Sequence, residues 1–302
     1  MDNFGIKEKV EKYRIKLNNK FENIKSKIIL KKIFNNIKKI QLLHIIKYNK
    51  NIMKRININI NDYKEFSEIY SSILIEIKPV ENEYGNFINI KKEEDKKYYH
   101  IYFDDNKKEV KRYNINKGEK INIIKIKIDN KINSFERLFS NCFIVESIYF
   151  KQFNRNNIKT MSNMFYACTL LKELNLINFN TNNVTDMSYM FYYCSSLKEL
   201  NLNNFNTNNV TNMNSMFYGC SLLKELNLNN FNTNNVTDMS YMFFGCSSLK
   251  KLNFKNFNPN NVTNKSYIFY HCASLEVLNF NNMVFMHVMF EQNPNEIINF
   301  EN

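Results

Sequence analysis

The sequence predicts an α/β solenoid built from 26-residue repeats, preceded by a helical N-terminal region and a small antiparallel β unit. Three observations point to the repeats: six evenly spaced cysteines, an Asn-rich stretch that recurs at the same interval, and apolar residues that return in the same order each time. Self-similarity at a period of about 20 to 50 residues is typical of stacked repeat architectures. Stacking buries a face that one unit cannot bury alone.

One repeat, residues 197–222, shows how the period is used. Leu200 and Leu202 lie two residues apart, so both point inward from an extended strand. The Asn-rich stretch 203–211 predicts a bend, because Asn tolerates left-handed backbone and bonds its own backbone. This order matches a leucine-rich-repeat pattern and predicts a right-handed coil. The returning segment carries three inward residues at helix-like spacing: Met216, Phe217 and Cys220.

Alignment in register predicts six such strands. Each cysteine occupies the same place in its repeat, where a reduced thiol acts as a small buried apolar side chain. We therefore expect free thiols in preference to disulfides. The strands are expected to begin at Val145, Leu171, Leu197, Leu223, Leu249 and Leu275.

The segment Asn209-Val210-Thr211-Asn212-Met213, with the run 216–226 that follows it, resembles the BspA-type leucine-rich repeats. That family occurs in bacterial surface lipoproteins and protist proteins and is also described as a domain of unknown function. The resemblance covers residues of about 130 to 282. It implies a curved coil that binds proteins or cell surfaces, with no catalytic residues.

The chain is expected to have four parts. Residues 1–64 form a basic helical region, because apolar residues from Ile6 to Ile28 recur every three or four positions. Residues 65–128 contain short β-rich runs and form a small antiparallel unit that caps the repeats. Residues 129–282 hold the repeats, and residues 283–302 form a C-terminal cap or tail.

The charge of the chain is concentrated near its start. Residues 1–60 carry 16 Lys/Arg and 4 Asp/Glu, a net charge of +12, whereas the other 242 residues carry 26 and 25. This segment is therefore a candidate for contact with a membrane or a polyanion, unless the excess reflects biased composition. The start shows no signal peptide and no window reaches a membrane span, so we expect an intracellular, cytoplasmic location, with surface display as the alternative.

The candidate binding residues are the outward side chains of the predicted strands. In a leucine-rich coil these columns lie on the concave face, where a protein partner usually binds. A solvated sheet, in which Lys and Glu neutralise one another and Asn forms a ladder, is the competing interpretation. The candidates are Lys172, Glu173, Asn175, Lys198, Glu199, Asn201, Lys224, Glu225, Asn227, Lys250 and Asn253.

No pattern in the sequence predicts catalysis. The histidines His44, His100, His271 and His287 share no motif, and five glycines in the whole chain leave little room for a Gly-rich nucleotide loop. No zinc spacing or paired-carboxylate pattern appears. We therefore expect no enzyme activity, no metal, no cofactor and no small-molecule substrate.

The sequence thus predicts a non-enzymatic scaffold or recognition protein. One alternative is an F-box-like ubiquitin-ligase adaptor, suggested by residues 33–43. The other is a cell-surface adhesin, for which four Asn-Val-Thr sequons would be glycan acceptors. A structural role for these asparagines is the favoured interpretation. The sequons begin at Asn183, Asn209, Asn235 and Asn261.

Overall fold

The computed structural model describes residues 50–55, 72–129, 131–153, 155–258 and 260–279. The chain divides into two compact units, residues 1–71 and 72–302. In the first unit the structure describes the short helix α4, Lys50–Arg55. The predicted helical stripe, the F-box-like residues and the C-terminal cap lie outside the described residues.

The second unit begins with an antiparallel sheet at the predicted β-rich runs. β1, Ile73–Pro79, lies between β5, Ile124–Ile128, and β6, Val145–Phe153. Alternate side chains of β1 and β5 are buried, as expected for strands with one face on a core. The remaining elements are β2, Gly85–Asn86, the 3-10 helix Glu93–Tyr98, β3, Tyr99–Phe103, and β4, Asn114–Ile115.

Strand direction changes at β6. This strand pairs antiparallel with β1 on one side and parallel with β7, Glu173–Asn175, on the other. One five-stranded sheet, in the order β3-β5-β1-β6-β7, therefore joins the antiparallel strands to the first repeats. The antiparallel strands thus cover the edge that β6 would otherwise expose.

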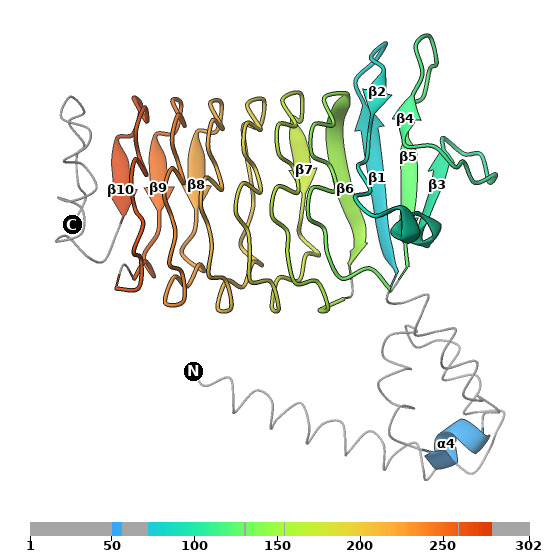
Figure 1. Cartoon of the computed structure of the whole chain (residues 1–302), viewed down its shortest axis with the longest axis horizontal. Coiled ribbons are helices and arrows are strands. Elements are labelled where there is room, and N and C mark those ends of the chain that lie inside the picture. The colour runs from blue at the N-terminus through green and yellow to red at the C-terminus, as the bar shows by residue number, and fades with distance from the viewer. Residues whose placement is uncertain (1–49, 56–71, 130, 154, 259, 280–302) are drawn as a thin grey trace. The chain divides into compact units, whose positions relative to one another are not determined.

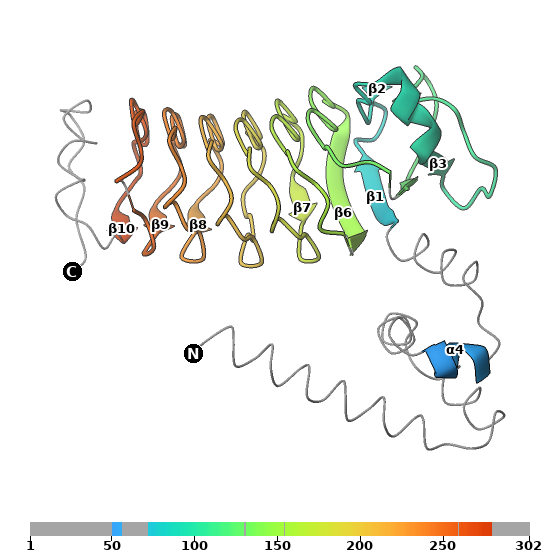
Figure 2. The same cartoon turned by 60° about the horizontal axis from the view of Figure 1, so that its bottom comes forward.

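The repeats stack along one axis from β6 to β10, and we call each 26-residue repeat a rung (Figures 1 and 2). Parallel pairing continues through β8, Glu225–Asn227, β9, Lys251–Asn253, and β10, Val277–Asn279. The third rung lacks an assigned strand, and the backbone bond from Lys224 N to Lys198 O is long, at 3.5 Å. Outside these strands, isolated parallel bridges also join each rung to the next. They connect, in succession, Ser134, Thr160, Asp186, Asn212, Asp238 and Asn264.

The α/β class and the leucine-rich-repeat solenoid predicted from the sequence are wrong. The described residues form strands in small sheets joined by turns, and their helices are α4 and the 3-10 helix alone. Met216, Phe217 and Cys220 lie in consecutive tight turns, which Ser215 and Gly219 interrupt at φ of 53° and 68°. A left-handed residue every four positions prevents an α-helix.

Hydrogen bonding explains why these turns replace a helix. Phe217 N donates to Met242 O of the next rung at 2.9 Å, and Gly219 N donates to Phe244 O at 2.7 Å. These amides therefore pair between rungs instead of four residues back along the chain. The spacing of apolar residues is compatible with both arrangements, so the sequence pattern alone did not separate them.

Columns of identical side chains fill the core between the strands and the turns. The six cysteines are buried and free, which agrees with the expected reduced thiols. The thiol of Cys220 donates to the carbonyl oxygen of Phe191 at 3.1 Å, and this contact recurs in neighbouring rungs. Parallel phenylalanine rings stack with centroids 5.4 to 5.6 Å apart through Phe139, Phe165, Phe191, Phe217, Phe243 and Phe269.

The Asn-rich bend is held mainly by bonds to the preceding rung. Asn204 Nδ2 donates to Leu176 O at 3.0 Å and to Phe179 O at 2.7 Å. Asn208 N donates to the side chain of Asn206, as an Asx turn requires. No residue of the bend 203–211 has positive φ, so the expected left-handed asparagine is wrong for this bend.

Candidate functional site

The predicted binding residues lie together on one surface, which we call the strand face: the exposed side chains of the rung segments that begin at Lys172, Lys198, Lys224 and Lys250. Lys and Glu occupy two neighbouring columns, and Asn occupies a third. Ten of the eleven predicted residues are exposed, and Asn253 is half-buried. The strands hold the columns in register because Glu225 and Asn227 pair directly with Lys251 and Asn253.

A groove of about 550 Å³ runs along the middle of the strand face. Residues of the third and fourth rungs line it, together with Asn253 of the fifth rung. The groove coincides with the rung that lacks an assigned strand. The predicted residues that line it are Lys198, Glu199, Asn201, Lys224, Glu225, Asn227 and Asn253.

Charge pairing differs between the ends and the middle of the strand face. At the ends, Lys172 Nζ lies 3.0 Å from Glu146 Oε1, and Lys250 Nζ lies 3.4 Å from Glu276 Oε1. In the middle, Lys198, Glu199, Lys224 and Glu225 form no ion pair with any described residue. Four exposed charges therefore border the groove without a counterion from the described part of the chain.

A second hollow, of about 310 Å³, lies over β1, β6 and β7 and is bordered by paired charges. Glu146 accepts hydrogen bonds from Lys78 and Lys172. These bonds, the one from Lys78 most of all, hold the pKa of the Glu146 carboxyl below its ordinary value of 4.5. Lys151 Nζ pairs with Glu76 at 2.9 Å, and Tyr149 donates to Glu173. These charges neutralise one another, so this hollow offers less to a charged ligand than the groove does.

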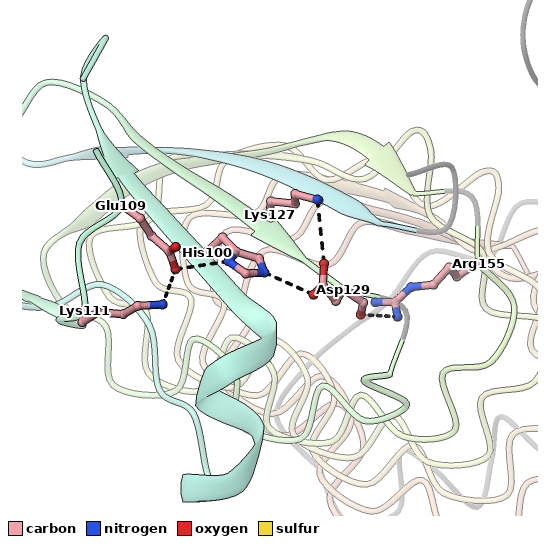
Figure 3. Close-up of polar contacts among 6 residues, drawn as sticks. All are labelled: His100, Glu109, Lys111, Lys127, Asp129 and Arg155. Atoms are coloured by element: carbon pink, nitrogen blue, oxygen red, sulfur yellow. Dashed lines mark hydrogen bonds and ion pairs between the residues drawn. The ribbon is translucent and has the colours of Figure 1, made fainter. Parts of the chain in front are cut away.

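His100 on β3 lies between two carboxylates (Figure 3). Its Nδ1 is 3.1 Å from Glu109 Oε1, and its Nε2 is 3.1 Å from Asp129 Oδ2. Lys111 donates to Glu109, and this bond is the main reason why the pKa of the Glu109 carboxyl is lowered. No Ser, Thr or Cys is among the described contacts of His100, so the arrangement joins three chain segments and presents no nucleophile beside the imidazole.

Arg155 extends this network through the backbone at Asp129 (Figure 3). Its Nη1 donates to the backbone oxygens of Asp129 at 2.8 Å and Ile132 at 3.0 Å. The side chain is 4% exposed, and burial lowers the pKa of its guanidinium to about 10. Its Nε and Nη2 are buried without a hydrogen-bond partner among the described residues.

The remaining sequence candidates do not assemble into a reactive centre in the described residues. His271 is exposed in a left-handed turn at φ 61° and packs edge-on against Tyr270. The described residues contain no group of three or more His, Cys, Asp or Glu side chains placed to hold a metal ion. None of the described helices combines the length and apolar character needed to cross a membrane.

An aromatic ridge along the turns was missed by the sequence analysis. Tyr166, Tyr192 and Tyr218 stack with centroids 4.6 Å apart, and Phe244 and Tyr270 continue the column. All five residues of this column are half-buried. Aligning the repeats at 26 residues places these five residues in one column, so the signal was present in the sequence.

A sequence model of the family described as "Mycoplasma protein of unknown function, DUF285" matches residues 133–226 and 196–300. The matches overlap and together span residues 133–300, which is more than half of the chain. They cover the rungs and begin after β5. None of the curated proteins compared with the chain matches it.

Proposed function

The chain belongs to the DUF285 family of Mycoplasma proteins of unknown function, and from its repeats we propose that it is a non-enzymatic recognition protein that binds a protein partner through the strand face. The observation that carries this proposal is the set of unpaired charges around the groove. Lys198 and Lys224 lie on neighbouring rungs, beside Glu199 and Glu225. Charges left exposed in this way are free to pair with a partner.

The geometry of the strand face supports binding in a second way. Hydrogen bonds between rungs already order the backbone beneath the columns, such as the bond from Lys250 N to Lys224 O at 2.8 Å. Binding to a preorganised surface costs less conformational entropy than binding that must first order a loop. We include in the proposal the finer resemblance to BspA-type repeats, whose use would also be the binding of proteins or cell surfaces.

The test is affinity capture from the native cell with the full chain as bait. The double variant Lys198→Glu/Lys224→Glu should lose a partner that the wild type retains, because two cations become anions at the groove. The matched control is Lys117→Glu/Lys120→Glu, which makes the same charge change at exposed positions away from the strand face. Equal capture by wild type and both variants would contradict the proposal.

Thermal unfolding of each bait separates binding from folding. Lys198 and Lys224 are exposed and unpaired with described residues, so their replacement should leave the unfolding midpoint within a few degrees of wild type. A large fall would instead assign these lysines to the stability of the stack. The F-box-like alternative rests on residues outside the described ranges, and a pull-down of a Skp-type subunit with residues 25–60 tests it.

A further inference from the structure

The Lys and Glu columns of the strand face have a fixed order and a fixed period. In the second, third and fourth rungs, Lys precedes Glu directly, at 172–173, 198–199 and 224–225. All six side chains are exposed. Parallel bridges connect the second, third and fourth rungs at Asp186, Asn212 and Asp238, so equivalent side chains recur every ~4.8 Å along the stack.

A partner that satisfies several of these charges at once must repeat its own charges at the same interval. An extended peptide running along the stack presents alternate side chains about 6.6 Å apart, which does not match ~4.8 Å. Another stack of parallel rungs does match. A second copy of this chain has both the period and the two signs of charge.

Symmetry decides how two copies would face each other. With a two-fold axis parallel to the stack, the Lys column of one copy lies opposite the Glu column of the other. Lys198 then meets Glu199 of the second copy, and the pairing is repeated in reverse, as an isologous interface requires. A two-fold axis along the strands would oppose Lys to Lys.

We propose that the strand face is a self-complementary surface through which two copies of the chain associate, with their stacks parallel. The inference rests on the proposed function, because it names the partner of the same face. Six rungs ~4.8 Å apart, each exposing about five residues, would cover roughly 800 Å² in two copies together. Interfaces of that size are typical of weak, reversible complexes.

One rung opposes this pairing and provides a sharper test. In the fifth rung the pair is Lys250 and Lys251, so Lys250 of one copy would face Lys251 of the other. Lys251 is exposed and forms no ion pair with a described residue. The substitution Lys251→Glu extends the Lys–Glu pairing by one rung and should tighten association at least twofold.

The experiment is sedimentation equilibrium of the full chain at up to about 1 mM, in low and high salt. We expect a monomer–dimer equilibrium in low salt whose dissociation constant rises at least tenfold in high salt. Lys198→Glu/Lys224→Glu and Glu199→Lys/Glu225→Lys should each be monomeric. Their equimolar mixture should form a heterodimer, since each face now carries one sign of charge.

Several outcomes would overturn the inference. They are a monomeric wild type, dimers that persist in both variants, and a mixture that stays monomeric although circular dichroism shows both variants folded. The control Lys117→Glu/Lys120→Glu should dimerise like the wild type. A monomeric wild type that still captures another protein through Lys198 and Lys224 would contradict self-association but support the proposed function.

Discussion

Tyr193 lies so close to Gly219 of the next rung that a Cβ atom on the glycine would meet the Cδ1 of the tyrosine at 2.7 Å. Gly219 has φ 68°, in the left-handed region. Gly245, one rung further on, has φ 69°, and the nearest atom to its Cβ would be 3.8 Å away. The two glycines therefore share a backbone conformation and differ in their contact with a tyrosine.

Gly219→Ala should destabilise the chain more than Gly245→Ala. Both variants place a side chain at positive φ, which costs about 1 to 2 kcal/mol. Gly219→Ala also displaces Tyr193 from its contacts with Tyr192 and Tyr218, which adds about 1 kcal/mol. The free energy of unfolding, measured in urea, gives the difference.

A second substitution separates steric contact from backbone strain. In a Tyr193→Ala background the added cost at Gly219 should disappear, and the losses from Gly219→Ala and Gly245→Ala should become equal. Equal losses already in the wild-type background would show that Tyr193 does not constrain Gly219.

This turn also marks the limit of what the sequence predicted about the fold. The period, five of the six predicted strands and the buried cysteines follow from repetition, because identical residues at a fixed spacing must occupy equivalent places in a stack. The strand predicted at Leu197 is absent. The α/β class is wrong around Met216 and Cys220, because the helix-like spacing of apolar residues is also compatible with successive tight turns. Tyr189 and Tyr193 adopt left-handed backbone, at φ 56° and 52°. The sequence did not predict this conformation, since tyrosine is not a typical turn residue.

The candidate site was predictable to a similar depth. Two-residue alternation with the buried Leu200 and Leu202 places Glu199 and Asn201 outward, whereas Lys198 was named because it is a polar residue that recurs at the same place in each repeat. The lack of ion-pair partners at Lys198 was not predictable, because Lys172 and Lys250 in the same column do form ion pairs. His100, Glu109 and Asp129 are up to 29 residues apart, and only strand pairing brings them together.

Asn204→Ala should destabilise the stack, whereas Asn203→Ala should not. The amide of Asn204 donates to two carbonyl oxygens of the preceding rung, and losing both bonds costs about 1 to 2 kcal/mol. Asn203 is exposed, and its side chain forms no hydrogen bond with a described residue. Urea unfolding of the two neighbouring variants is the measurement, and equal stability would contradict a role for the Asn204 amide.

The six thiols should be inert in the folded protein. All are buried, and burial raises the pKa of Cys168 and Cys220 to about 12, so almost no reactive thiolate forms near pH 8. Intact mass after iodoacetamide treatment should show no adduct in native buffer and six adducts in urea without reductant. Fewer than six in urea would reveal a disulfide, and rapid native labelling would place a cysteine at the surface.

Glu146→Gln should lower the stability of the fold at neutral pH but not in acid. Because Lys78 and Lys172 lower the pKa of Glu146 in the folded chain, its ionised form stabilises the fold fully above the ordinary value of 4.5. That contribution is lost as the pH falls below 4.5 through the lowered pKa. The wild type should therefore melt at a higher temperature than Glu146→Gln at pH 7, and the difference in melting temperature should disappear in acid.

Glu199→Gln is the control, since Glu199 has no ion pair with described residues, and its melting temperature should follow the wild type at pH 7. A gap at Glu146 that stays constant from pH 7 to acid would show that the two lysines do not stabilise its charge.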